Sequence, residues 1–269
     1  MRHEEKKIKS LQALLLAGIL LLFGTTTHGN TNLPIDQLLE IPLEVTLLPE
    51  EKASEFILNP YEWEALAHYL YQFKTKSDHG IWNICGKRLN DQEMKAAAYA
   101  YSRELLKAHH TTFYTIKRGR VKHKVKVPLQ GVVGVMISES RLDYCALGPH
   151  PRKWAYKHKL LKPNPKGTGT PSFTQEEILK VLNHPTWRKR LADLGPGQMV
   201  WGRNKRAIFK GKPEELLSLS PGIKHVFEEM ADRGHRKNSV RPWIYWPGER
   251  PHHWYDIRIM KFIRQVFAH

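Results

Sequence analysis

The chain has 269 residues and a formal net charge of +17, from 43 Lys and Arg against 26 Asp and Glu. This length allows one large or two small domains with a real hydrophobic core. Two cysteines, Cys85 and Cys145, exclude a disulfide-rich scaffold and a paired-cysteine metal site, because neither has a second cysteine at ligand spacing. The positive charge favours a polyanionic partner without identifying it.

Residues 1–29 have the layout of a secretory signal, and we expect cleavage after Gly29. A short basic lead is followed by the apolar run Leu11–Phe23 and then by small residues. The run is shorter than the about 20 residues of a membrane-spanning helix, so we expect no stable span after cleavage. An uncleaved N-terminal anchor is the alternative. Both readings place the protein in the periplasm or outside the cell, where nucleic acid is not an expected partner.

The first half of the chain reads as helices followed by one hairpin. Leu33–Thr75 is mostly helical and broken by prolines, with a helix opening at Pro60 after the cap Asn59. A second helix is predicted over Asp91–Ala108, where Asn90 is the cap. Thr111–Val127 instead alternates apolar and polar residues around a Gly turn, which predicts a β-hairpin with solvent-facing basic side chains.

Leu129–Ser140 is the strongest helical pattern. Its apolar residues recur at i, i+3, i+4, i+7 and i+8, so we expect a buried helix that ends in Glu139 and Ser140. Gly148–Pro171 reads as an ordered loop or short helix followed by a flexible piece. Further helices are predicted over Phe173–Leu182, Glu214–Leu219, Pro221–Arg233 and Trp254–Phe267. The sum is a mainly α protein with one small hairpin.

An oxidising compartment predicts a disulfide between Cys85 and Cys145, and two separate core thiols are the alternative. The bridge would connect the loop after Glu139 to the segment that precedes the Asp91 helix. We expect it to hold the end of the Leu129–Ser140 helix in place.

Elimination leads to a carboxylate as the group that carries chemistry. The chain has no Gly-x-Ser-x-Gly elbow or phosphate-binding loop, and its adjacent histidine pairs lack the i, i+4 spacing of a metal site. Glu139 follows the apolar stripe of its helix, where desolvation would raise the carboxyl pKa and suit a general acid. Periodicity alone favours a surface Glu that caps the helix or pairs with Arg141 or a nearby Lys.

Three segments in order resemble the soluble lytic transglycosylases, relatives of goose-type lysozyme. They are Leu129–Ser140 with its terminal Glu-Ser, Gly195–Met199, and Tyr245–Gly248 with the helix after it. The resemblance implies that Glu139 is the catalytic acid and that Ser140, Gln198 and Tyr245 contact substrate. The interval from Glu139 to Gln198 is longer than in the family, which implies an insertion near residues 149–190.

The family resemblance also implies the domain layout and the reaction. A lysozyme-like helical catalytic domain would span residues 127–269, after an N-terminal helical region at 30–126 that ends in the hairpin near 111–127. Glu139 would cleave the bond between N-acetylmuramic acid and N-acetylglucosamine in peptidoglycan, without a metal or cofactor, in a monomer. The alternatives are a muramidase, with Asp143 or Asp193 as second carboxylate, and a non-enzymatic wall-binding protein. Four tryptophans are candidates for sugar stacking or for the core: Trp154, Trp201, Trp243 and Trp246.

Overall fold

The computed structural model describes residues 58–163, 169–187, 190–203 and 205–267. The predicted secretory signal at residues 1–29 lies outside these ranges. The α-helices are α3 (Pro60–Gln72), α4 (Asp91–Thr111), α5 (Leu129–Ser140), α6 (Pro149–Lys157), α7 (Gln175–Asn183), α8 (Pro213–Leu216), α9 (Leu219–Lys237) and α10 (His253–Phe267). The strands are β1 (Asn83–Ile84), β2 (Lys87–Arg88), β3 (Phe113–Arg118), β4 (Val121–Lys126), β5 (Ala192–Leu194) and β6 (Met199–Trp201).

The protein is mainly α, as predicted, but the expectation of a single hairpin is wrong. The described residues form three antiparallel two-stranded sheets, β1–β2, β3–β4 and β5–β6. Only β3–β4 has strands of six residues, long enough for alternation to be visible in the sequence. The turn of β1–β2 is Cys85-Gly86 with positive φ at both residues, the geometry of a tight hairpin turn.

Side-chain caps explain where two of the helices begin. The Asn90 side chain accepts from the backbone N–H of Glu93, whose carboxylate accepts from the N–H of Asn90, at 2.9 Å in both directions. The same reciprocal capping box joins Thr174 and Glu177 at the start of α7. The start of α4 agrees with the sequence prediction, and α4 runs three residues past its predicted end, to Thr111. Helix α7 begins two residues after its predicted start at Phe173.

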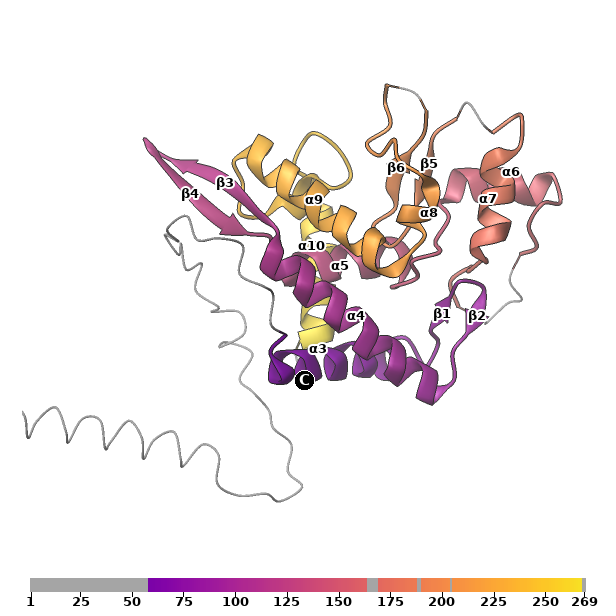
Figure 1. Ribbon diagram of the computed structural model, residues 1–269, viewed down its shortest axis with the longest axis horizontal. Coiled ribbons are helices and arrows are strands. Elements are labelled where there is room, and N and C mark those ends of the chain that lie inside the picture. The colour runs from indigo at the N-terminus through magenta and orange to yellow at the C-terminus, as the bar shows by residue number, and fades with distance from the viewer. Residues whose placement is uncertain (1–57, 164–168, 188–189, 204, 268–269) are drawn as a thin grey trace, which may run out of the picture. The chain divides into compact units, whose positions relative to one another are not determined.

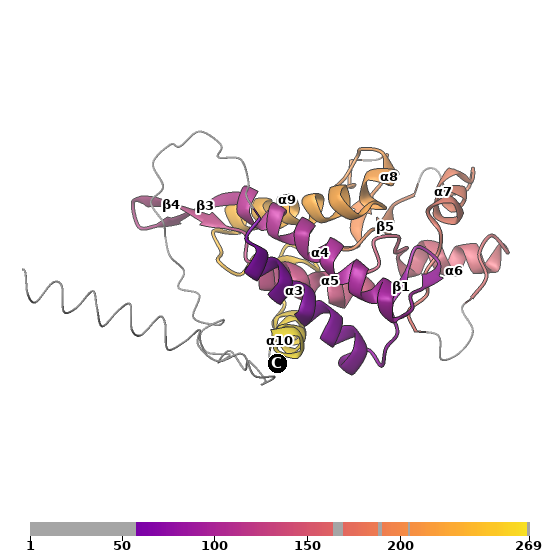
Figure 2. The ribbon, with the colours of Figure 1, turned by 60° about the horizontal axis from the view of Figure 1, so that its bottom comes forward.

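Helix α5 lies in the middle of the larger of two hydrophobic clusters. It packs among α4, α9 and α10 in both views (Figure 1, Figure 2). The larger cluster also includes residues of α3, so the N-terminal helices and the predicted catalytic segment share one core. The second cluster comes from residues 145–217, including α6, α7 and the β5–β6 hairpin. Described residues of the segment predicted as an insertion contribute to this cluster. The predicted domain boundary between residues 126 and 127 stays a prediction.

Glycines in α5 allow its neighbours to approach the helix axis. A Cβ at Gly131 would come within 2.3 Å of the Trp243 ring, and one at Gly134 within 2.7 Å of the Ile259 side chain. Gly is unfavourable in a helix interior by about 1 kcal/mol relative to Ala. Close packing of Trp243 and of α10 (Ile259) against α5 explains why these positions nevertheless hold glycine.

Within the part of the chain that the structure describes, no helix is both long enough and apolar enough to span a bilayer. Helix α5, the most apolar in sequence, has 12 residues and is enclosed by other helices.

Gly131→Ala should destabilise the protein although Ala favours helix. The added methyl group overlaps the Trp243 ring, and overpacking of this kind costs about 1–3 kcal/mol, more than the propensity gain. We expect the free energy of unfolding to fall by about 1–2 kcal/mol in urea denaturation. The neighbouring Gln130→Ala, at a half-buried position of the same helix, should change it by less than about 0.5 kcal/mol. A Gly131→Ala protein as stable as wild type would contradict this account of α5.

Candidate active site at the end of helix α5

Helix α5 ends in two successive residues with left-handed backbone. Arg141 has φ 56° and Leu142 has φ 64°, values that non-glycine residues rarely adopt. The Leu142 side chain is fully buried, and its carbonyl accepts hydrogen bonds from the Trp82 indole at 3.2 Å and from the Tyr101 hydroxyl. The chain therefore reverses direction sharply after Ser140, where α5 ends, and these contacts hold the reversal in place.

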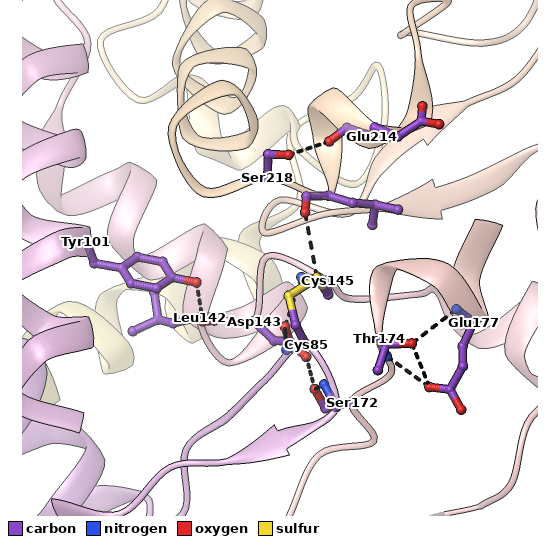
Figure 3. The surroundings of a disulfide bond; sticks show 12 residues. Cys85, Tyr101, Leu142, Asp143, Cys145, Ser172, Thr174, Glu177, Glu214 and Ser218 are labelled. Atoms are coloured by element: carbon purple, nitrogen blue, oxygen red, sulfur yellow. Dashed lines mark hydrogen bonds between the residues drawn. A yellow bond between two sulfur atoms is a disulfide. The ribbon is translucent and has the colours of Figure 1, made fainter. Parts of the chain in front are cut away.

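The disulfide joins the β1–β2 turn to the loop that follows α5, as predicted. Cys85 and Cys145 are bonded, with their Cα atoms 4.8 Å apart. Between them the Asp143 carboxylate accepts from the backbone N–H groups of both cysteines, at 3.1 and 2.9 Å, and from the Ser172 hydroxyl at 2.5 Å (Figure 3). Burial raises the pKa of Asp143 to about 6. Its bonds give Asp143 a structural role in connecting three segments.

Glu139 lies one residue before the end of α5 and meets α10. The buried Tyr255 hydroxyl donates to the Glu139 carboxylate at 2.6 Å. One turn further along α10, Arg258 donates to the carbonyl of Ser138 at 3.1 Å, which satisfies a free carbonyl at the helix end. Glu139 is therefore held by α10 and is half-buried, in contrast to the surface Glu that periodicity also allowed.

Burial raises the pKa of the Glu139 carboxyl above its ordinary value. The Tyr255 hydrogen bond and the Arg258 charge oppose this by stabilising the carboxylate, and the Asp193 charge adds to the increase. The net direction is upward because burial disfavours the charged form most strongly. A carboxyl whose pKa is moved toward neutrality is suited to donate a proton and to take one back.

Glu139 faces a pocket of about 510 Å³. Two other predicted site residues, Ser140 and Gln198, also line it. The Ser140 hydroxyl is buried and donates to the Met136 carbonyl at 2.9 Å, within its own helix. Four basic residues contribute to the pocket wall: Lys74, His79, Arg141 and Arg152. Two acidic residues besides Glu139 also line it, Asp78 and Asp143, and Asp78 pairs with Lys74 at 2.7 Å and with Arg141 at 3.7 Å. The structure thus brings Glu139, Ser140 and Gln198 together in a pocket of mixed charge.

Gln198 reaches the pocket from the turn of the β5–β6 hairpin. It has a left-handed backbone (φ 51°), and its side-chain amide donates to the Gly195 carbonyl at 3.2 Å. The Trp246 indole donates to the Gly197 carbonyl at 3.0 Å, and a Cβ at Gly197 would lie 3.0 Å from the Trp246 ring. Gly197 and Trp246 contact each other and support the Gln198 turn.

Tyr245 does not line this pocket. Its ring lies beside the Lys237 ammonium, 5.7 Å from the ring centre, and its carbonyl accepts from the buried guanidinium of Arg233. Arg233 is paired with Glu229 at 2.6 Å. The predicted contact between Tyr245 and substrate stays a prediction. The tyrosine that contacts Glu139 is Tyr255.

Asp193 is the second carboxylate close to Glu139. Burial raises its pKa, and its charge is near enough to raise the pKa of Glu139. A Cβ at Gly148 would lie 3.0 Å from the Asp193 carboxylate and 3.1 Å from the Gln198 side-chain oxygen. The absence of a side chain at Gly148 therefore allows Asp193 and Gln198 to come close to the same point of the backbone.

Most of the tryptophans proposed for sugar stacking serve the core. Trp201 and Trp243 are buried, and Trp154 packs on the rings of Trp187 and of nearby histidines. Trp254 on α10 is 56% exposed and in edge contact with Tyr255 at 5.4 Å, but it does not line the pocket. Sequence patterns placed Tyr255 in a helix but offered no signal that it approaches Glu139.

One cluster of the described residues has the spacing of a metal site, Cys85 with Asp143 and Cys145. Both sulfur atoms are joined in the disulfide, so neither is a thiolate ligand there.

No known protein-family model, curated protein or solved structure matches this chain.

Replacing both cysteines with serine should lower stability substantially. The bridge closes a loop of 60 residues, for which chain entropy predicts a loss of about 4 kcal/mol from the free energy of unfolding. Urea denaturation of the variant and of wild type measures the difference. A reducing agent provides the control, because it should destabilise the wild type to a similar extent and leave the serine variant unchanged. Equal stability of the oxidised wild type and the variant would contradict the structural role of the bridge.

Proposed function

We propose that this protein cleaves the glycan strands of peptidoglycan, with Glu139 as the single acid and base of a lytic transglycosylase reaction. The observation that carries the proposal is the Glu139 carboxyl, which is partly buried, raised in pKa, bonded to Tyr255 and open to a pocket. The sequence resemblance across Leu129–Ser140, Gly195–Met199 and Tyr245–Gly248 supports the same assignment.

The pocket is suited in size to such a substrate and offers it polar contacts. Its volume of about 510 Å³ is within the range of ligand-binding clefts. The peptide stems of peptidoglycan carry carboxylates, and Arg152 on the pocket wall offers a positive charge to such groups. Gln198 adds an amide that can hydrogen-bond to sugar hydroxyl or acetamido groups.

In the proposed reaction Glu139 first donates its proton to the glycosidic oxygen between N-acetylmuramic acid and N-acetylglucosamine. The bond from muramic C1 to this oxygen breaks, and the N-acetylglucosamine hydroxyl leaves. Glu139, now a carboxylate, accepts the proton of the muramic 6-hydroxyl while that oxygen bonds to C1 and closes a 1,6-anhydro ring. The proton balance is zero and water takes no part, so one carboxyl group is sufficient.

This proposal includes a lysozyme-like arrangement of the helical core. A buried helix that delivers a catalytic Glu at its C-terminal end, beside a pocket, is the feature that the resemblance implies. Helix α5, with its packing against α10 and its left-handed end at Arg141, supports that assignment.

A hydrolase is the second candidate, and Asp193 favours it. Inverting glycosidases use a second carboxylate to activate water. Asp193 is within electrostatic range of Glu139, whereas Asp143 is occupied by the backbone of Cys85 and Cys145. The Asp193 carboxylate could hold the attacking water, and the product would then be a reducing end.

Glu139→Gln should reduce peptidoglycan cleavage by at least about a hundredfold, because the amide cannot donate the required proton. Mass spectrometry of digested peptidoglycan should show 1,6-anhydro-muramic ends with the wild type. Binding of the variant to insoluble peptidoglycan should be preserved, since the side chains are similar in shape.

Asp193→Asn is the matched control for the second carboxylate. It should retain anhydro products under the lyase proposal and lose activity under the hydrolase alternative. Reducing ends from the wild type would replace the lyase with the hydrolase. Wild-type binding without any cleavage would favour a non-enzymatic wall-binding protein.

Tyr255→Phe should move the basic limb of the pH–rate profile to higher pH. Glu139 must start protonated, so activity falls as pH rises through its pKa. The Tyr255 hydrogen bond stabilises the carboxylate and lowers this pKa, and removing it raises the pKa further. Rates of cleavage measured across pH test the shift.

Tyr245→Phe serves as the comparison, because the Tyr245 ring contacts Lys237 rather than Glu139. Its basic limb should fall at the wild-type pH. A basic limb at the same pH in Tyr255→Phe and wild type would refute the coupling between Tyr255 and Glu139.

A further inference from the structure

The β3–β4 hairpin carries an uncompensated positive charge. Residues 117–126 contain six Lys and Arg, and residues 111–127 contain no Asp or Glu. In the described part of the molecule, the hairpin lies on the opposite side from α6 and α7 (Figure 1, Figure 2). Such a concentration of like charge raises the free energy of the isolated protein, so it calls for an explanation through a partner.

The strand register places four of these lysines on one face. Directly opposite residues of an antiparallel pair lie on the same side of the sheet. Lys117 is opposite Lys122, Thr115 is opposite Lys124, and Phe113 is opposite Lys126. All four lysines are exposed. We call this set, Lys117, Lys122, Lys124 and Lys126, the lysine face.

The other face of the hairpin is attached to the protein. Tyr114 and Ile116 are buried, and the Tyr114 hydroxyl donates to the Ser239 carbonyl at 3.0 Å. The edge of β3 is bonded to the end of α9, where Asn238 accepts from the Lys117 N–H at 2.5 Å and donates to its carbonyl at 2.9 Å. The lysine face is therefore presented outward from a fixed support.

Within the described ranges, no carboxylate lies within ion-pair distance of the four lysines. The contacts recorded for their ammonium groups are with the Phe113 ring, 4.6 Å from Lys124, and with His110, 3.3 Å from Lys126. Neither contact neutralises a charge. The lysine face remains available to an anionic partner.

We infer that the lysine face docks the protein onto an anionic lipid surface. Lysines act as point charges that do not need a precise partner geometry, which suits the headgroups of a bilayer.

Two other anionic partners fit the lysine face less well. Recognition of nucleic acid bases would require Asn, Gln or Arg or an open aromatic ring, and the one ring on this face, Phe113, is covered by Lys124. The glycan pocket lies at the other end of α5, a helix of 12 residues and thus about 18 Å long. The inference does not depend on the proposed function.

The test is sedimentation of the full chain with vesicles. Wild type should bind vesicles of phosphatidylcholine and phosphatidylglycerol, bind pure phosphatidylcholine weakly, and lose binding as salt rises. Replacing the four lysines with Gln should weaken binding by at least about tenfold. The matched control replaces four exposed lysines elsewhere, Lys157, Lys162, Lys210 and Lys212, with the same change of net charge.

The control variant should bind like wild type if position matters, and both variants should keep the circular dichroism and melting temperature of wild type. Equal weakening in the two variants would reduce the effect to net charge and overturn the inference. Binding to neutral vesicles as strong as binding to anionic ones would also overturn the inference. The same holds if the lysine face makes the protein prefer duplex DNA or peptidoglycan to anionic vesicles. Cleavage activity on soluble glycan is a separate measurement, so failure here leaves the proposed function untouched.

Discussion

The left-handed turn at Arg141 and Leu142 is the constraint on which the site depends. Two consecutive non-glycine residues in this region cost about 1–3 kcal/mol each. Burial of the Leu142 side chain, the bonds of Trp82 and Tyr101 to its carbonyl, and the disulfide just beyond offset that cost. Without them the last turn of α5 would be free to unwind, and the carboxyl that it carries would lose its alignment with α10.

The site forms where the two hydrophobic clusters meet. Glu139 belongs to a helix of the larger cluster, whereas the Gln198 turn follows β5 in the smaller one. Cys85, Tyr144 and Trp246 pack against both clusters. A pocket at such a boundary has walls that are packed against different clusters. Described residues between 149 and 187 supply many of the buried side chains of the smaller cluster.

Sequence patterns predicted the long, regular elements of this fold and missed the short ones. Helix α5 and the hairpin β3–β4 were evident because twelve residues of one period, or six per strand, repeat a signal several times. The strands β5 and β6 have three residues each, too few for a period to be visible. The apolar stripe placed Glu139 at the end of a buried helix, whereas its proposed role comes from the resemblance and stays a prediction. The disulfide was predicted from a count of two cysteines in an exported chain. The approach of Tyr255 depends on how α10 crosses α5, which no local pattern encodes.

The glycines of α5 also restrict how this protein could be made more stable by design. Exchanging helical Gly for Ala is a standard route to thermostability, because it reduces the entropy of the unfolded chain. At Gly131 and Gly134 that route is closed, since Trp243 and Ile259 already occupy the space of the new methyl group. A thermostable variant would have to be sought on the exposed sides of α4, α7 and α9, where new side chains meet solvent. The helix that carries the carboxyl would then keep its native sequence through any such programme.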